Sequence, residues 1–244
     1  MMRGTFCLAA ALSLWGCSNA NNQAPCVETL EVTGVQEGQR LFADPNLSAS
    51  LFNDFSCATC HAVEDGDTRI LAGRDLRGVT ARPRTWGGNQ RDLLTAVNFC
   101  LVYFMRGQPL PPDDIRSRSL WEYLKSLESV PGAVTTTLPM TVVRTAADVA
   151  RGDPTRGQEV YARACQECHG DKDTGAGRIN DLATNLTEVR AESDQLFPGT
   201  PHALVFAEKV RHGQFFGVGG NMPLYSLEAL SNEDLGALFA YLGL

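Results

Sequence analysis

CATCH at residues 57–61 occurs a second time in this chain as CQECH at residues 165–169. Two cysteines three positions apart lie on one helical turn, so each thiol can add to one vinyl group of a haem. The histidine that follows directly can then reach the iron as the proximal ligand. A zinc site does not need this histidine, and a thioredoxin-like redox motif needs a βαβ context that the sequence lacks. We therefore expect two covalently bound haem c groups, held by Cys57, Cys60, His61, Cys165, Cys168 and His169.

The two motifs lie inside a longer internal repeat. GQRLF at residues 38–42 returns as GQEVY at 157–161, whereas the haem motifs lie eleven residues closer together than these segments. The first copy therefore carries an eleven-residue insertion before its haem motif. Each copy ends in a segment with apolar residues at helical spacing. These residues are Leu120, Tyr123, Leu124 and Leu127 in the first copy, and Leu235, Leu238, Phe239 and Leu242 in the second.

The repeat predicts two sequential domains. The chain has 244 residues, of which 43% are apolar and 20% are charged, as is ordinary for a globular protein. The stretch from Pro131 to Ala150 lacks helical periodicity and is typical of a linker. Ser231-Asn-Glu-Asp234 is a capping box that starts the last helix. The predicted units are a signal peptide (1–16), an N-terminal tether (17–34), a first domain (35–130), a linker (131–150) and a second domain (151–244).

The N-terminus has the features of an export signal. Arg3 precedes an apolar run at residues 6–15 that is too short to span a bilayer. The run ends in Leu-Trp-Gly-Cys17, which resembles the lipobox of bacterial lipoproteins, and Ser18 resembles an outer-membrane sorting signal. We therefore expect a periplasmic, outer-membrane lipoprotein lipidated at Cys17. Ordinary secretion or an uncleaved anchor stays open, because Trp15 stands where lipoproteins usually have a small residue.

The charge of the chain limits its partners. A formal net charge of −7 argues against nucleic acid, because binding to phosphates needs a basic surface. An acidic protein is better suited to basic partners. No other segment approaches the length and apolarity of a membrane-spanning helix, so we expect membrane contact only through the lipid anchor.

These features together resemble class I c-type cytochromes over nearly the whole mature chain. The resemblance implies an all-α fold of two sequential class I cytochrome c domains, each with one covalent haem. It also implies that an N-terminal helix crosses a C-terminal helix, at Gly38 in one domain and Gly157 in the other. In the family a proline carbonyl after the haem motif often accepts a hydrogen bond from the proximal histidine. Here Arg178 follows Gly175-Ala-Gly177 instead, so the acceptor is left open.

The resemblance also implies a distal ligand for each haem. Met222 precedes Pro223 as in the Met-Pro loop of the family, and Met105 occupies the equivalent place before the closing helix of the first domain. We expect both methionines to coordinate iron. Each could instead merely fill core space, and His202 or His212 could replace Met222. Met140 falls in the linker and is not expected to be a ligand.

Cys26 and Cys100 are left over once the haem motifs, the signal and the lipid site are assigned. They could form a disulfide in an exported protein. Alternatively, Cys100 could ligate the first haem in place of Met105. The segment around Cys100 resembles that of dihaem thiosulfate dehydrogenases and sulfur-oxidation cytochromes that supplies a thiolate ligand. The stretch from Leu41 to Ser48 separately resembles the entry to the first haem site of dihaem cytochrome c peroxidases.

The expected function is single-electron transfer between periplasmic redox proteins rather than catalysis. The alternative is a thiosulfate-oxidising or peroxidase-type dihaem enzyme that acts at the first haem. A haem-based sensor is less favoured, because Met222 would fill the coordination site. Arg84 and Trp86 are candidates for binding haem propionates.

Overall fold

The computed structural model describes residues 25–146, 149–220 and 222–244. The predicted signal peptide and Cys17 lie outside these residues. In the described part the chain is helical, with two isolated β-bridges and no longer strand, which confirms the expected all-α class. The α-helices are α1 (Pro25–Phe42), α2 (Cys57–Cys60), α3 (Leu93–Phe99), α4 (Ile115–Ser126), α5 (Pro154–Ala164), α6 (Gln166–His169), α7 (Leu186–Leu196), α8 (His202–His212) and α9 (Asn232–Leu242). Short helical turns cover Pro45–Ser48, Val79–Ala81, Trp86–Gly88, Cys100–Phe104 and Leu127–Ser129.

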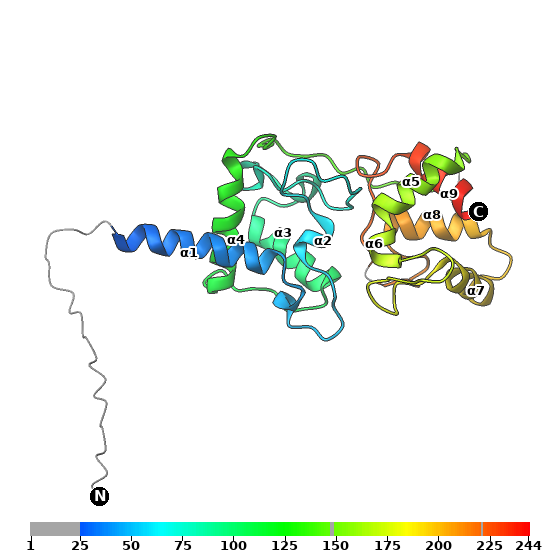
Figure 1. The fold of residues 1–244 in the computed structure, drawn as a ribbon, viewed down its shortest axis with the longest axis horizontal. Coiled ribbons are helices and arrows are strands. Elements are labelled where there is room, and N and C mark those ends of the chain that lie inside the picture. The colour runs from blue at the N-terminus through cyan, green and yellow to red at the C-terminus, as the bar shows by residue number, and fades with distance from the viewer. Residues whose placement is uncertain (1–24, 147–148, 221) are drawn as a thin grey trace, which may run out of the picture.

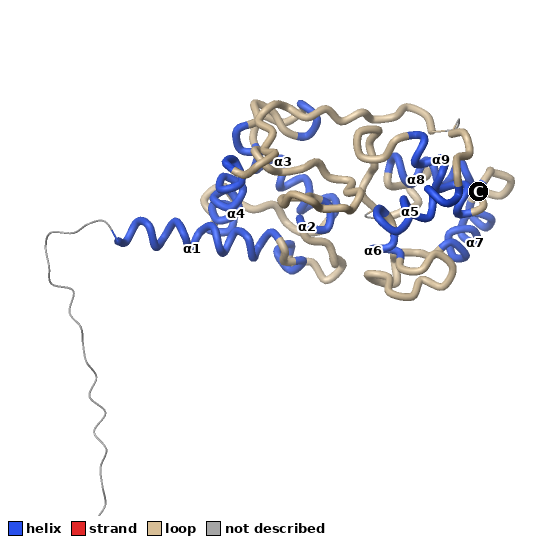
Figure 2. Tube along the Cα trace, turned by 45° about the horizontal axis from the view of Figure 1, so that its top comes forward, coloured by secondary structure: helices blue, strands red, loops and turns tan. Residues whose placement is uncertain are grey.

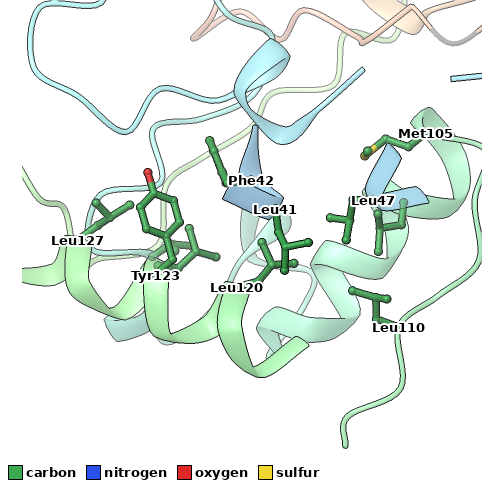
Figure 3. Packing of buried hydrophobic residues seen from close by; sticks show 11 residues of the cluster. Leu41, Phe42, Leu47, Met105, Leu110, Leu120, Tyr123 and Leu127 are labelled. Atoms are coloured by element: carbon green, nitrogen blue, oxygen red, sulfur yellow. The ribbon is translucent and has the colours of Figure 1, made fainter. Parts of the chain in front are cut away.

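The first domain is built on the crossing of α1 and α4, which Figure 1 shows as the blue and green helices. The helices meet at Gly38, where an added Cβ would overlap the carbonyl oxygen of Ser119 and lie 2.6 Å from the Cβ of Tyr123. The rings of Phe42 and Tyr123 then pack with their centroids 5.5 Å apart. Figure 3 shows the buried cluster that this crossing organises, with Met105 at its edge.

The second domain repeats this arrangement with α5 and α9. An added Cβ at Gly157 would overlap the carbonyl oxygen of Ala237 and lie 2.7 Å from the Cβ of Tyr241. The rings of Tyr161 and Tyr241 stand where Phe42 and Tyr123 stand in the first domain, with centroids 5.8 Å apart. Ser231 caps α9 by accepting the amide of Asp234 at 3.0 Å, as its sequence predicts. The predicted repeat is therefore one helix pair used twice.

The apolar faces predicted for the two closing helices are buried. Their exposed fractions lie between 0% and 9%, which confirms the helical periodicity found in the sequence. The residues are Leu120, Tyr123, Leu124, Leu127, Leu235, Leu238, Phe239 and Leu242.

The structure adds detail to two predicted segments, the tether and the linker. Helix α1 begins at Pro25, so part of the predicted tether (17–34) is helical. The stretch after Pro25 contains no further proline, and proline is favoured in the first turn of a helix. The predicted linker lacks helix in its described residues, but it is packed rather than free. Its Val134 carbonyl accepts from Arg82 at 2.8 Å, and Thr141 donates to Glu228 of the second domain.

The loops that connect the helices carry much of each domain, as Figure 2 shows in tan. The predicted insertion is the segment between Phe42 and Cys57, which contains the short turn Pro45–Ser48. No helix in the described part of the chain is long and apolar enough to cross a bilayer.

Two candidate haem sites

The first CATCH motif forms helix α2, a single turn whose start is fixed by its own side chains. The backbone N–H of Ser56 donates to the hydroxyl of Thr59 at 3.1 Å, and the Ser56 side chain contacts the same turn. This capping places Cys57 and Cys60 on one wall of an apolar cavity in the first domain. The two thiols therefore stand on one turn, as attachment to two vinyl groups requires.

His61 is held in a single orientation by the loop that follows it. Its Nδ1 lies 2.7 Å from the carbonyl oxygen of Arg74. Because a carbonyl can only accept, Nδ1 carries the proton and Nε2 keeps its lone pair for a metal. Burial lowers the pKa of His61, which also favours the neutral ring. A Cβ at Gly73 would lie 2.5 Å from the ring, so the loop closes directly on the histidine.

His169 is held in the same manner in the second motif. Its Nδ1 lies 2.8 Å from the carbonyl oxygen of Thr184, and burial lowers its pKa. Thr184 is therefore the acceptor that the sequence left open. Arg178, which stands where the family has proline, instead pairs with Glu188 at 2.9 Å and Asp181 at 3.0 Å.

The lining of the first cavity contains both residues proposed as its sixth ligand. Met105 is 3% exposed, and Cys100 is a half-buried free thiol. A π-helical turn, Cys100–Phe104, separates them, and the amide of Met105 donates to the carbonyl of Cys100 at 3.1 Å. Such turns often occur at functional sites. Burial raises the pKa of the Cys100 thiol to about 12, with a further contribution from the nearby Cys57 and Cys60.

Cys100 is a free thiol on the lining of this cavity. The side chain of Cys26, its alternative disulfide partner, lies outside the described part of the chain, so the disulfide stays a prediction.

Met140 lies closer to the first site than the sequence indicates. Leu138 and Met140 of the linker both line the cavity, and Met140 packs against the turn Trp86–Gly88. A Cβ at Gly87 would lie 2.9 Å from the Cβ of Met140, so the contact is close. Outside the CATCH motif, the lining of the first cavity therefore contains Met140 as a sulfur-bearing side chain in addition to Cys100 and Met105.

In the second domain Met222 packs against the same apolar cluster as Cys165, Tyr225 and Tyr241. The two histidines considered in its place have other partners. The Nε2 atom of His202 lies 2.8 Å from Asp194, and that of His212 lies 3.4 Å from Glu208. This pairing leaves Met222 as the better donor for the second site.

Polar groups on the first cavity fit the carboxylates of a haem. Arg84 and Trp86, both candidates from the sequence, line the cavity together with Arg74 and Arg82. The buried Nε of Arg74 has no hydrogen-bond partner, and burial lowers the pKa of Arg82. A buried donor without a partner is costly, and a propionate would satisfy it. The sequence analysis missed Arg74 and Arg82, although the density of arginines between His61 and Trp86 is a signal for them.

The two sites share a wall. Pro223 and Leu224, which follow Met222, line the first cavity. The hydroxyl of the next residue, Tyr225, donates to the carbonyl of Ala164 at 2.8 Å, directly before the second motif. Burial raises the pKa of Tyr225, with further contributions from the Cys165, Cys168 and Cys60 thiols. Tyr225 thus lies within electrostatic range of both motifs.

Hydrogen bonds fasten the loop after His61 to the second motif. The amide of Ile70 donates to the carbonyl of Arg163 at 2.8 Å, and the Arg163 guanidinium donates to the carbonyl of Thr68 at 2.5 Å. Arg69 pairs with Glu167, the residue between Gln166 and Cys168, at 3.1 Å. We call this contact between the two domains the seam.

Among the residues that the structure describes, no group of three or more His, Cys, Asp and Glu side chains could hold a metal ion.

Comparison with known proteins supports a cytochrome in the second half of the chain. Residues 152–242 match the family model described as cytochrome c oxidase, cbb3-type, subunit III. A solved structure, the as-isolated form of thiosulfate dehydrogenase (TsdBA) from Marichromatium purpuratum, is 21% identical and aligns over 87% of this chain with a TM-score of 0.42. This chain spans less than half of that one, 45% of its length. No curated protein matches the chain at a significant level. The chain thus contains a cytochrome c domain, the kind of domain that binds haem c covalently.

Proposed function

We propose that this c-type cytochrome carries two haems and passes single electrons between redox proteins. The observation that carries the proposal is the likeness of the two sites. Each joins a CxxC pair to a histidine whose Nδ1 is fixed by a backbone carbonyl, at Arg74 in one site and Thr184 in the other. Each also has a methionine in its apolar surroundings. Haem iron bound in this way supplies a reversible one-electron couple.

The residues of the chain have separate tasks in this function. His61 and His169 offer a neutral nitrogen in a fixed direction. Met105 and Met222 offer thioether sulfur, a ligand that raises the reduction potential relative to a second histidine. The apolar walls exclude water, which also favours the less charged reduced state. The arginines of the first cavity offset the charge of the propionates.

The shared wall supports transfer within the molecule. Leu224 reaches the first cavity while Met222 belongs to the second core. Cys168 contributes to the raised pKa of Cys60, so the second cysteines of the two motifs lie within electrostatic range of one another. An electron that arrives at one site therefore has a short path to the other.

Cys100 supports a second candidate function, a thiosulfate-oxidising enzyme acting at the first site. A free thiol on the lining of the cavity could bind the iron as thiolate, which lowers the potential and suits sulfur chemistry. Met105 on the same lining supports the carrier instead. The two functions therefore depend on which sulfur binds.

Export and lipidation belong to the same proposal. The run at residues 6–15 and Cys17 support a periplasmic protein held at the outer membrane by a lipid. A Cys17→Ala variant should then leave the membrane fraction and appear in the soluble periplasm. Equal membrane retention of both forms would contradict lipidation at this residue.

The carrier is tested by a redox titration combined with a turnover assay. We expect two one-electron steps, rapid exchange with small redox reagents, and no sustained turnover of thiosulfate or peroxide. The wild type could instead turn over thiosulfate many times, and Cys100→Ser could lose this activity while both haems stay bound. This result would replace the electron-carrier assignment by the thiosulfate-oxidising one.

A further inference from the structure

Two loops, one from each domain, expose large apolar side chains at the seam. In the inserted loop Leu51 is 98% exposed and Phe52 is 78% exposed, and in the second domain Leu182 is 79% exposed. The loops are joined by a hydrogen bond from the amide of Asn180 to Asp54 at 2.7 Å. We call Leu51, Phe52 and Leu182 the seam patch. Exposed apolar side chains on two loops that are joined in this way indicate a surface that contacts another molecule.

Both loops hold their apolar residues in place. Asn53, next to Phe52, donates from its amide to the carbonyls of Pro45 and Phe55, each at 2.7 Å. Asn180 accepts the amide of Leu182 at 2.9 Å. Side chains on fastened loops lose less entropy on binding than side chains on free ones. The seam patch is therefore prepared for contact before a partner arrives.

The seam patch also adjoins both haem motifs. The inserted loop runs directly into Ser56 and helix α2. The loop of Leu182 is tied to the second motif, because the amide of Ile179 donates to the carbonyl of Cys168 at 3.0 Å. A protein bound to this patch would sit beside the cysteines of both sites.

The surroundings of the seam patch are strongly acidic. Residues 54–70 and 165–182 contain eight carboxylates and only three lysines or arginines, a net charge of −5 out of −7 for the whole chain. Several of the carboxylates are well exposed, including Asp181 with 96% and Glu167 with 54% of the side chain accessible. Much of the net charge of the protein thus lies in two segments, one that follows the inserted loop and one that ends at Leu182. A basic surface would be attracted to it from a distance.

We propose that the seam patch is the docking site for a basic electron-transfer protein whose apolar contact face is ringed by lysines. This rests on the proposed electron-carrying function. Three apolar residues within an acidic rim make a small contact, as is typical of transient redox complexes. Attraction between charges brings the partner in, and Phe52 and Leu182 provide the central apolar contact.

The test measures second-order electron transfer from a reduced, lysine-rich mitochondrial cytochrome c, with an acidic flavodoxin as the contrasting probe. Raising the ionic strength from about 0.01 M to about 0.15 M shortens the Debye length from about 30 Å to about 8 Å. We expect the rate with the basic probe to fall at least tenfold over this range, and the rate with the acidic probe to rise. A rate with the basic probe that does not depend on salt would overturn the proposal.

Substitutions separate the rim from the apolar contact. Glu167→Lys with Asp181→Lys should slow the basic probe about tenfold at low salt and little at high salt. Phe52→Ser with Leu182→Ser should slow it severalfold at both. The controls are Asp113→Lys and Ile115→Ser, which change an exposed charge and an exposed apolar residue at the start of α4, the helix on the side of the first domain away from the second domain (Figure 1). Equal effects in the controls and the patch variants would overturn the proposal.

Two further measurements keep the outcomes distinct. Each variant is first checked for its haem spectrum and for its rate of reduction by a small reagent, which tests the carrier function alone. If the patch variants keep their haem spectrum and transfer electrons with the basic probe as fast as the wild type, the docking site is refuted. The carrier function is not affected by that result. Sedimentation equilibrium of the whole protein should show a monomer. A dimer that Phe52→Ser dissociates would mean that the patch binds a second copy of this chain instead.

Discussion

His61 and His169, the proposed proximal ligands, are each held in one orientation by a single backbone carbonyl. Each ring is buried, each Nδ1 faces a carbonyl oxygen, and neither acceptor belongs to the CxxCH motif. Arg74 follows His61 by thirteen residues and Thr184 follows His169 by fifteen. Because any residue can offer a carbonyl, the sequence could predict the ligands but not their acceptors.

Met222 gives the most direct prediction at the residue scale. Met222→Ala should remove the thioether from the second site, abolish the weak sulfur-to-iron band in the far red that belongs to it, and lower its potential. Visible spectroscopy and a redox titration measure both effects. His212→Ala is the control, because its ring pairs with Glu208. A sulfur-to-iron band and a potential that are both unchanged in Met222→Ala would contradict this ligand, and a low-spin signal of the second site that changes in His212→Ala would reassign it.

The competition between Met105 and Cys100 makes a second prediction. If Met105 binds the first iron, Met105→Ala should change the low-spin paramagnetic resonance signal of that site, whereas Cys100→Ala should leave the signal in place. Met140→Ala, on the same cavity, should change neither the signal nor the potential strongly. If Cys100→Ala changes the low-spin signal and Met105→Ala does not, the first iron has a thiolate ligand, and the sulfur-oxidising function is supported instead.

At the scale of elements, the two helix crossings depend on one glycine each. Replacing glycine by alanine inside a helix normally stabilises it by up to about 1 kcal/mol. At Gly38 and Gly157 the sign should reverse, because the added Cβ overlaps a carbonyl of the partner helix, and overpacking costs about 1–3 kcal/mol. Denaturant unfolding of Gly38→Ala and Gly157→Ala measures this.

Gly34→Ala is the matched control for these crossings. It lies one turn earlier on α1, where an added Cβ would come no closer than 3.7 Å to Glu122. Its free energy of unfolding should stay the same or rise. A Gly38→Ala variant as stable as Gly34→Ala would contradict the close crossing.

The linker makes a pH-dependent contact with the second domain. The amide and hydroxyl of Thr141 donate to Glu228, and these hydrogen bonds lower the pKa of Glu228 to about 2. A carboxyl with a lowered pKa stabilises the folded state above its unfolded pKa and loses this contribution as pH falls towards its folded pKa. Glu228→Gln should therefore be less stable than the wild type at pH about 7, and the difference should vanish near pH about 2. A difference that does not change with pH would refute this contact.

The elements also show what a sequence can predict. Helical periodicity is local, so the buried faces of α4 and α9 and the cap at Ser231 followed from a few neighbouring residues. The glycine crossings followed from a family resemblance. Met140 and Arg74 could not be placed, because irregular segments bring them to the first cavity without any repeating pattern. Helix α1 begins inside the segment predicted as a tether, since no proline between Pro25 and Gly34 interrupts it.

At the scale of the whole molecule, the two domains meet where their haem motifs lie. Loop 67–70 reaches Arg163 and Glu167, and the segment after Met222 reaches the first cavity. The ion pair between Arg69 and Glu167 is exposed, so it contributes little to stability. The backbone hydrogen bond from Ile70 to Arg163 and the packing of Ile70 on the core of the second domain are better suited to hold the domains together. A seam at this place keeps both sites within reach of one another.

The central claim is that both motifs bind haem covalently, and intact mass spectrometry after acid–acetone extraction tests it most directly. Thioether bonds survive the extraction, so the mature protein should keep two haems, about 2 × 616 Da above the mass of the polypeptide. A Cys57→Ala, Cys60→Ala variant should keep one haem, and so should a Cys165→Ala, Cys168→Ala variant. A wild-type chain with one haem or none after extraction would contradict the account.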